Sequence, residues 1–450
     1  MRNRIMGIMF LIVVLLLMRG IVHYDPHHGA SESAVAASVF LSQEYLRGSM
    51  QGWSGTTLDL NGDGNEDLLV GAPYAQQNAT MGALLVYLAT PTGFAAHPSA
   101  VLAGDGNLGW SLVALGDVNG DGKADFAAGA YTGSGEDVSL SGTVAIYQGG
   151  GKPRKVAVLT GENAMDKFGY ALAGGDVNGD GKADLIVGAP FCSPSPALYQ
   201  QGAVYVYFGP GYNPADAVKI PASLANGGIG FSLAAGDIND DGVDDLLLGA
   251  SGKVIGFYGA RGSFSPSANP DVVFSSMDSG FGRNIAVLWD LNRDGFRDVA
   301  VGAHQAVIAN VSETGRLFIL KGGSGKRTVN ADVGLSPDVL AKIDGEPNCG
   351  RFASEILPVA DVDNDGIPEL AVSAEHADGN PWPMTGKIFL FSGRTLTAGA
   401  TVASARVIPG EARDMHLGAF LAVVGKGSRL AAGAPTENAN TGRVRLFDLR

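Results

Sequence analysis

The sequence predicts an all-β fold: a seven-bladed β-propeller of four-stranded blades, closed by an N-terminal strand. Three observations support this prediction. A block that runs from an FG-type pair through an acidic turn to a GAP-type triplet recurs along the chain, and an alternating strand that starts at a glycine follows each copy. No segment between the copies has a useful helical period. One pattern of strands repeated at a regular spacing is typical of a propeller.

The repeat has seven copies. Two of them read "LGWSLVALGDVNGDGKADFAAGA" and "FGYALAGGDVNGDGKADLIVGAP", and they share the stretch "DVNGDGKAD" letter for letter. From Gly52 to Gly418 the chain covers 366 residues in six intervals, or 61 residues per repeat. The copies occupy residues 51–73, 108–130, 168–190, 229–250, 281–304, 352–375 and 417–435.

Each copy predicts the same series of strands. An apolar stretch follows the FG pair, a second strand such as "DLLVGAP" follows the acidic turn, and the third strand reads "GALLVYL" or "GAVYVYF". Segments such as "SAVLAGD" and "VAVLTGE" supply a fourth strand. The period of two and the Val, Ile, Tyr and Phe content are typical of strands.

The seventh copy has no fourth strand of its own. The segment "SVFLSQE" at 38–44 resembles the fourth strands and precedes the first repeat. We therefore expect residues near 38–43 to pair with the strand at 442–449 and close the ring, which removes an exposed sheet edge.

The N-terminal segment differs in composition from the repeats. Arg2 and Arg4 precede an apolar run over Ile5–Met18, which is typical of a secretory signal peptide, although a membrane anchor over residues 5–22 remains an alternative. We expect residues 1–22 to be a signal peptide or signal-anchor, 23–33 a linker and 34–450 the propeller. Either alternative predicts a secreted or extracytoplasmic protein.

Charge and cysteine content exclude other classes. The formal net charge of −14 argues against a nucleic-acid partner, which would require a basic face. The two cysteines, Cys192 and Cys349, provide neither a disulfide framework nor a CxxC zinc site. We expect a monomer.

The acidic turns carry the clearest chemistry. In six copies, oxygen-bearing side chains stand at positions 1, 3, 5 and 9, and glycine stands at position 6, where a sharp turn favours it. Position 7 has no common side chain, which suits a backbone carbonyl ligand. The predicted ligand residues are Asp59, Asn61, Asp63, Asn65 and Asp67; Asp117, Asn119, Asp121, Lys123 and Asp125; Asp176, Asn178, Asp180, Lys182 and Asp184; Asp237, Asn239, Asp241, Val243 and Asp245; Asp290, Asn292, Asp294, Phe296 and Asp298; and Asp361, Asp363, Asp365, Ile367 and Glu369. The seventh copy has "GKGSR" there, and we expect it to bind no metal.

Hard oxygen ligands in this number favour Ca²⁺ over zinc, copper or Mg²⁺. Three interpretations compete. An EF-hand would need a Glu at position 12, where all six turns have an apolar residue, and flanking helices. Catalysis would need one carboxylate pair in two different environments, not six similar copies. A structural clamp fits best, with up to six Ca²⁺ ions that offset the repulsion among closely spaced carboxylates.

These residues resemble the FG-GAP repeat of the integrin α-subunit N-terminal propeller. The resemblance covers about residues 50–450 and implies seven blades, Ca²⁺ in the turns between strands one and two, and partner binding on the opposite face. The sequence departs from the family in having six acidic turns rather than a few and in lacking the disulfides usual in animal integrin propellers. We therefore expect a bacterial or archaeal exported protein, without integrin-type heterodimers.

The loops between strands two and three should open on the face away from the acidic turns. They vary among the copies, and such loops on a rigid scaffold commonly bind ligands. The candidate ligand-face residues are Tyr74, Tyr131, Phe191, Tyr199 and Trp382. The aromatic residues that follow the repeat glycine, Trp53, Trp110, Tyr170 and Phe231, are interpreted as packing between blades, with a ring near the axis as the alternative.

The function expected from these features is cell adhesion or protein or glycan binding by a cell-surface scaffold that is not an enzyme. The alternative is a polysaccharide-acting hydrolase or lyase with its site on the face opposite the calcium turns. No catalytic triad or inward carboxylate pair identifies itself in the sequence. His304 and His376 should share a face, but no nucleophile or third metal ligand is evident beside them.

Overall fold

The computed structural model describes most of the repeat region. The described residues are 39–41, 48–77, 80–90, 93–135, 138–193, 201–221, 228–266, 269–332, 336–347, 349–379, 381–396 and 399–449. All of them belong to one compact unit that spans Ala36–Arg450. Among these residues, no helix is long and apolar enough to cross a membrane. The signal peptide or signal-anchor and the linker predicted for residues 1–33 lie outside the described residues.

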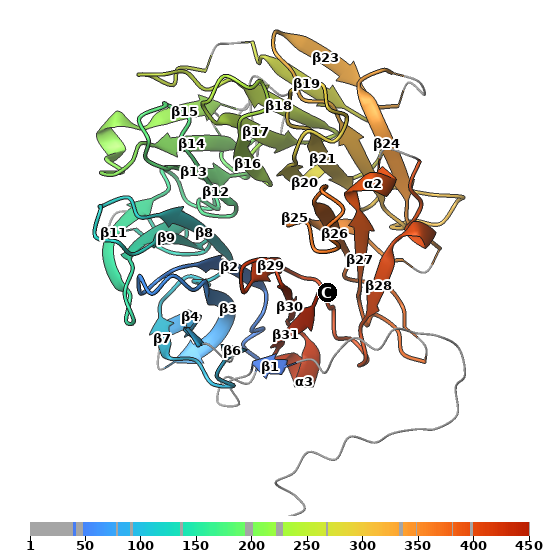
Figure 1. The fold of residues 1–450 in the computed structure, drawn as a ribbon. Coiled ribbons are helices and arrows are strands. Elements are labelled where there is room, and N and C mark those ends of the chain that lie inside the picture. The colour runs from blue at the N-terminus through green and yellow to red at the C-terminus, as the bar shows by residue number, and fades with distance from the viewer. Residues whose placement is uncertain are drawn as a thin grey trace, which may run out of the picture. The chain divides into compact units, whose positions relative to one another are not determined.

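Seven antiparallel sheets form the blades of a propeller, as the sequence predicted (Figure 1). Blades 1 to 4 consist, in sheet order, of β2 (Ser54–Leu58), β3 (Asp67–Gln77), β4 (Thr80–Tyr87) and β7 (Ala100–Ala103); β8 (Ser111–Gly116), β9 (Asp125–Ala130), β10 (Thr143–Gln148) and β11 (Arg154–Thr160); β12 (Leu172–Gly175), β13 (Asp184–Ala189), β14 (Ala203–Tyr207) and β15 (Val218–Pro221); and β16 (Leu233–Gly236), β17 (Asp245–Ala250), β18 (Lys253–Phe257) and β19 (Val272–Ser275). Blades 5 to 7 consist of β20 (Phe281–Val287), β21 (Val299–Ala303), β22 (Arg316–Leu320) and β24 (Val339–Asp344); β25 (Phe352–Val359), β26 (Glu369–Ala374), β27 (Lys387–Ser392) and β28 (Arg406–Pro409); and β29 (Leu421–Val424), β30 (Arg429–Ala434), β31 (Arg443–Asp448) and β1 (Val39–Leu41).

The first strands of the blades line the axis. Each packs against the first strands of both neighbouring blades, in the cyclic order β2, β8, β12, β16, β20, β25 and β29, and β29 returns to β2. The ring is therefore closed, and the inner strands are the elements that surround the axis.

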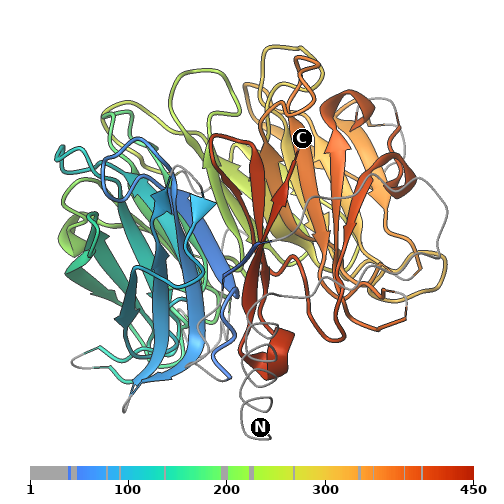
Figure 2. The same ribbon diagram turned by 60° about the horizontal axis from the view of Figure 1, so that its bottom comes forward.

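The N-terminal strand closes the last blade, as predicted. β1 pairs antiparallel with β31, with Val39 opposite Leu446 and Leu41 opposite Val444. In Figure 2 the blue beginning and the red end of the propeller accordingly lie side by side. Nearby, the Ser49 hydroxyl donates a hydrogen bond to the Thr441 carbonyl, and backbone hydrogen bonds link Met50 and Gln51 to Asn440 and Thr441, so a second group of contacts joins the two ends of the repeat region.

Blade 4 differs from the four-strand prediction. A fifth strand, β23 (Arg327–Asn330), pairs in parallel with the outer strand β19 and extends the sheet. This strand comes from the long connection between β22 and β24 of blade 5. A two-stranded ribbon, β5 (Ala89–Thr90) with β6 (Gly93–Phe94), and two short helices, α2 (Gly393–Leu396) and α3 (Glu437–Asn440), complete the regular structure of the described residues together with two 3₁₀ turns, Pro214–Asp216 and Val402–Ser404.

The apolar core lies between neighbouring blades. Blade 1 residues such as Leu68 and Val70 pack with Phe420 and Val444 of blade 7 in one buried cluster, and equivalent clusters lie at other blade interfaces. Because the second and third strands are covered on both faces, their side chains are buried in long runs, as in β13. Burial of this apolar area drives the association of the blades.

Glycine contacts set the distance between blades near the axis. At five of the seven blade interfaces, the glycine of the GAP-type triplet in one blade meets the glycine of the FG-type pair in the next. A Cβ atom at Gly188 would lie 2.2 Å from the Gly230 carbonyl oxygen, and one at Gly433 would lie 2.0 Å from the Gly52 carbonyl oxygen. No real side chain fits at these contacts, so glycine is required there by space rather than by backbone conformation.

We expect Gly188→Ala to lower the free energy of unfolding by about 3 kcal/mol, because the added methyl group overlaps backbone that cannot move without shifting a blade. Urea unfolding followed by circular dichroism measures this change. Gly211→Ala is the matched control, since a Cβ there would meet no atom within 4 Å, and its effect should stay within about 0.5 kcal/mol. Equal stabilities of the two variants would contradict the role assigned to the glycine contact.

Candidate functional site

The six acidic turns join the first and second strands of blades 1 to 6. In every turn the carboxylate at position 1 accepts a hydrogen bond from the backbone N–H of the glycine at position 6, for example Asp59 Oδ2 from Gly64 at 2.8 Å and Asp361 Oδ2 from Gly366 at 2.9 Å. These glycines have φ values between +81° and +94°. The prediction that position 6 needs the conformational freedom of glycine is therefore confirmed.

Position 5 and position 7 close the turn from the other side. The Asp63 carboxylate accepts a hydrogen bond from the Asn65 N–H at 2.9 Å, and Asp180 accepts one from Lys182 at 2.8 Å. Equivalent bonds recur in the other four turns. Since position 7 contributes its backbone here, the variety of its side chains is explained.

The carboxylates at position 9 connect each turn to the sheet behind it. Asp245 accepts hydrogen bonds from the N–H groups of Ile238 at position 2 and of Gly259 beyond the third strand, both at 2.9 Å. Asp67, Asp184, Asp245 and Asp298 are fully buried, and Glu369 is 2% exposed. Burial raises the pKa of Asp245 to about 7 and that of Asp67 to about 6, and the carboxylates at positions 5 and 1 add to the effect.

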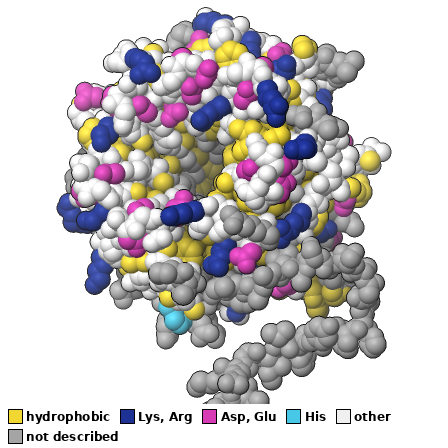
Figure 3. Space-filling model, in the orientation of Figure 1, with side chains coloured by type: hydrophobic (Ala, Val, Ile, Leu, Met, Phe, Trp, Pro, Cys, Tyr) yellow, Lys and Arg dark blue, Asp and Glu magenta, His cyan; other side chains and the backbone are white. Residues whose placement is uncertain are grey.

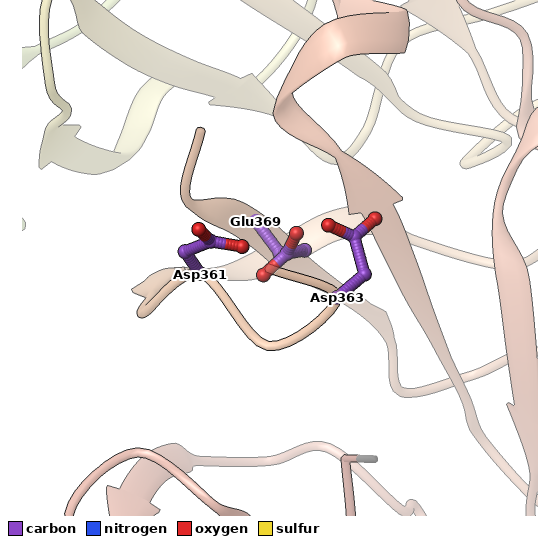
Figure 4. A group of neighbouring side chains, drawn as sticks. All are labelled: Asp361, Asp363 and Glu369. Carbon is purple, nitrogen blue, oxygen red and sulfur yellow. The ribbon is translucent and has the colours of Figure 1, made fainter. Parts of the chain in front are cut away.

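The turns contain oxygen atoms suited to a cation. Asp361, Asp363 and Glu369 each offer a carboxylate oxygen, and these oxygens lie within 4.8 Å of one another. Figure 4 shows the carboxyl groups of Asp361 and Asp363 near that of Glu369. In the described part of the chain, Glu369 Oε1 is buried without a hydrogen-bond partner, and so is Asn292 Oδ1 at position 3 of the fifth turn. Buried oxygens without partners fit a hard cation, because a cation would satisfy them.

An axial cavity of about 470 Å³ lies at the other end of the inner strands. It is lined by the residues that begin these strands, such as Ser54, Ser111 and Leu233, whereas the acidic turns follow the ends of the same strands. Figure 3 looks along the axis from the end that carries the acidic turns, and it shows that the ring is hollowed at its centre there too, with hydrophobic side chains around the hollow. The cavity and the acidic turns therefore lie at opposite ends of the propeller axis.

Aromatic rings from blades 1 to 4 form one side of the cavity, which we call the aromatic wall. The wall consists of Trp53, Trp110, Tyr170 and Phe231. Successive ring centroids are 4.6, 5.4 and 5.6 Å apart. These rings do pack between blades, as the sequence indicated, but Trp53, Trp110 and Phe231 also face the cavity.

Three of the five candidate ligand-face residues contact the aromatic wall. The ring of Tyr131 lies 4.3 Å from that of Trp110, Phe191 lies 5.5 Å from Phe231, and Tyr74 lies 6.4 Å from Trp53. Trp382 is 47% exposed and does not line the cavity. Tyr199 lies outside the described residues.

Polar residues of blades 5 to 7 form the opposite side, which we call the polar wall. It consists of Arg283, Asn284, His304, Ser354, Glu355, Glu375 and His416. The Arg283 guanidinium lies 3.7 Å from the centroid of the Phe231 ring, where the two walls meet. The cavity thus combines an apolar stacking surface with hydrogen-bonding groups.

The two glutamates of the polar wall have different surroundings. Glu355 has no hydrogen bond or ion pair within the described part of the chain, and burial together with the neighbouring Glu375 raises its pKa to about 8. Glu375 Oε1 accepts a hydrogen bond from Arg351 Nη1 at 3.4 Å, and Arg351 Nε also contacts Glu313 at 3.2 Å. At neutral pH, Glu355 is therefore mostly protonated, while Arg351 balances a charge on Glu375.

The histidines of this region are held in the neutral form. Burial, together with the positive charges of Arg351 and Arg283, lowers the pKa of His304 to about 4. Its Nδ1 is buried without a hydrogen-bond partner in the described part of the chain. Burial also lowers the pKa of His376 and of His416, whose ring centroids are 4.8 Å apart.

Comparison with known families identifies the repeat. The FG-GAP repeat profile matches residues 51–85, 108–147, 168–207 and 281–320, which belong to blades 1, 2, 3 and 5. This chain contains FG-GAP repeats. Its fold agrees with the propeller expected from the integrin α resemblance.

Relatives of the FG-GAP protein fall into two groups. Phosphatidylinositol-glycan-specific phospholipase D of Bos taurus is 26% identical over 422 residues, which cover 82% of this chain and 48% of the relative. Integrin alpha-IIb of Mus musculus is 34% identical over 222 residues, 45% of this chain and 20% of the relative. Integrin alpha-7 of Rattus norvegicus is 39% identical over 168 residues, 35% of this chain and 14% of the relative. The chain thus spans about half the length of the phospholipase and a fifth or less of these integrin chains.

The polar wall arises where the FG-GAP protein departs from its own repeat. The GAP-type proline of blades 1, 3 and 7 is replaced by His304 in blade 5 and by Glu375 in blade 6. Glu355 occupies the place that serine has in blades 1, 2 and 4. Sequence reasoning identified no inward carboxylate pair, yet the cavity contains one. A search for polar departures next to the FG and GAP motifs would have found it.

We expect the Glu355 carboxyl of the FG-GAP protein to titrate with a midpoint near pH 8, because it is partly buried in the cavity wall beside Glu375. Carboxyl ¹³C NMR of glutamate-labelled protein measures this midpoint. The signal that is absent from the spectrum of the Glu355→Gln variant belongs to Glu355. Glu162→Gln, an exposed ion-pair partner of Lys219, is the control and should leave that signal in place. A midpoint below pH 6 would contradict the environment described for Glu355.

Proposed function

We propose that this protein is an exported, calcium-stabilised scaffold that binds a glycan in the axial cavity and acts in adhesion at the cell surface. The observation that carries the proposal is the pairing of the aromatic wall with the polar wall in one cavity. Sugar rings offer apolar faces that stack on aromatic side chains and hydroxyls that need hydrogen-bond partners. A protein ligand is the alternative outcome of the binding test below.

Calcium is assigned to the six turns by their donor chemistry. The ligand oxygens are carboxylates, Asn side chains and backbone carbonyls, which are the ligands that Ca²⁺ prefers. Nineteen of the 45 acidic residues occupy ligand positions of these turns, and a divalent cation would offset their mutual repulsion. The ion would supply stability rather than reactivity, since in the first five turns the position 9 carboxylate also accepts a hydrogen bond from the backbone just beyond the third strand of the blade.

Export is assigned from the N-terminal sequence. Arg2 and Arg4 before the apolar run at residues 5–18 favour a signal peptide or an anchor over residues 5–22. Millimolar calcium outside the cell would suit turns of modest affinity, because extracellular calcium modules bind as weakly as ~10⁻⁴–10⁻³ M.

We expect removal of Ca²⁺ with EDTA to lower the melting temperature by about 10 °C or more, because ions that bind only the folded state stabilise it by mass action. Differential scanning calorimetry measures the shift, and elemental analysis should find up to six Ca²⁺ per chain. Asp361→Ala should lose one Ca²⁺, whereas the control Asp338→Ala, outside the turns, should lose none. An unchanged melting temperature of the calcium-free protein would contradict a stabilising role for Ca²⁺ in the turns.

The same experiment has a predicted pH dependence. Burial raises the pKa of Asp245 from 3.8 to about 7 and that of Asp67 to about 6. Between pH 4 and these values, the metal-free folded protein holds protons that the unfolded chain has released, so its stability falls as the pH rises. The EDTA-induced decrease in melting temperature should therefore be larger at pH 8 than at pH 5.

We expect Trp53→Ala and Trp110→Ala to weaken glycan binding at least tenfold, since each removes part of the stacking surface. A glycan array followed by calorimetry with the oligosaccharide that binds best measures this change. Trp382→Ala, an exposed tryptophan that does not line the cavity, is the control and should bind normally. If surface proteins bind but no glycan does, the ligand of the cavity is a protein rather than a glycan.

A further inference from the structure

We propose that Glu355 and Glu375 act as a proton donor and a proton acceptor that hydrolyse a glycosidic bond of a glycan bound against the aromatic wall. This inference rests on the proposed function, because it requires that the cavity accept a glycan. It extends that function from binding to catalysis.

The two carboxyl groups are brought together by one blade. Glu355 lies on β25, and Glu375 directly follows β26, the strand paired with β25. Phe352 pairs with Ala374 and Ile356 with Val372, and a bulge lies between these pairs. Bulges of this kind redirect side chains, and here both glutamates line the axial cavity. The pair occurs once in the ring, unlike the six acidic turns.

The surroundings of the two groups assign their roles. Glu355 has no partner in the described part of the chain, and its raised pKa of about 8 keeps the proton on it at neutral pH. Glu375 receives a hydrogen bond from the Arg351 guanidinium, which stabilises a carboxylate. A pair of carboxyl groups that differ in this way provides an acid and a base at the same pH.

The other cavity residues bind and orient the substrate. The aromatic wall provides faces on which sugar rings stack, and it excludes water from one side of the bond. Arg283 and Asn284 belong to the polar wall beside Glu355 and offer hydrogen bonds to hydroxyl or carboxylate groups of the sugar. The neutral imidazole of His304 offers a further hydrogen-bonding site, because its Nδ1 has no partner in the described part of the chain.

The proposed reaction consumes one water molecule. Glu355 gives its proton to the glycosidic oxygen, and the bond between that oxygen and the anomeric carbon breaks. Glu375 accepts a proton from a solvent water molecule, whose oxygen forms the new bond to the anomeric carbon. Proton exchange with solvent then returns Glu355 to its protonated form and Glu375 to its carboxylate.

The test uses the full chain with Ca²⁺ and the polysaccharides xylan, pectin, chitosan and laminarin. Release of reducing ends measures hydrolysis, and calorimetry measures binding of the same glycans. We expect Glu355→Gln and Glu375→Gln to lower kcat at least 100-fold, as the loss of a general acid or base does, while the dissociation constant changes less than threefold. Glu162→Gln is the control and should keep full activity.

A pH profile of the unaltered protein provides a second readout that does not depend on a variant folding. The charged and titratable groups that line the cavity together with Glu355 are Arg283 and His304 of blade 5, Glu375 of blade 6 and His416 before blade 7. Activity should fall as the pH rises through about 8, because Glu355 then loses the proton that it donates.

The outcomes separate the two proposals. Glycan binding without hydrolysis would overturn the catalytic pair and leave the binding scaffold intact. Hydrolysis that survives Glu355→Gln would also overturn the assignment, because another group would then supply the proton. If no glycan binds, the proposed function fails first, and the catalytic inference fails with it.

Discussion

The contact between glycines of neighbouring blades is the constraint on which the rest of the structure depends. Six of the seven blades provide a glycine in their GAP-type triplet, and each of these glycines leaves no room for a side chain against the next blade. The exception is Ser373 of blade 6, whose Cβ lies 2.6 Å from the place where a Cβ on Gly418 would be. This close approach lets the inner strands meet in a ring, and the size of the ring determines the size of the axial cavity.

The two ends of the inner strands are subject to different physical demands. At one end, the turn must reverse the chain while it satisfies several backbone N–H groups, and the acidic sequence does this in the same way six times. At the other end, side chains project into a space that no neighbouring blade fills. Side chains there expose part of their surface to the cavity rather than to a neighbouring blade, so they can differ from one blade to the next. The aromatic wall and the polar wall of the cavity are the result of this variation among the blades.

Much of the fold could be predicted because the seven copies of the repeat can be compared with one another. The blade number, the closing strand and the positive φ of the glycine at position 6 all follow from comparing one copy with the next. Strand β23 could not be predicted in this way, because a single connection contains it and no other copy repeats it. The four residues Arg327–Asn330 form a strand because they pair with the backbone of β19, the outer strand of blade 4.

The candidate site was predicted only in part, for a related reason. A sequence pattern indicates which residues occupy equivalent places, but it does not reveal which places in different blades face each other across the axis. Glu355 and Glu375 stand 20 positions apart in the sequence and are joined by the pairing of β25 with β26 and by the bulge within it. The pKa of Glu355 is raised by desolvation in the cavity wall and by the neighbouring Glu375, neither of which its own place in the sequence reveals.

The closing strand has a consequence for biosynthesis. Its partner β31 lies far from it in the sequence, and the nearby Ser49–Thr441 hydrogen bond spans 392 residues. Contacts between distant parts of a chain form slowly, because a long loop must close before they contribute free energy. Until then the edge of β31 exposes unpaired backbone groups that can pair with other chains. Completion of the seventh blade is therefore expected to be the slow step of folding, and the period before it is when the newly made protein is most exposed to aggregation.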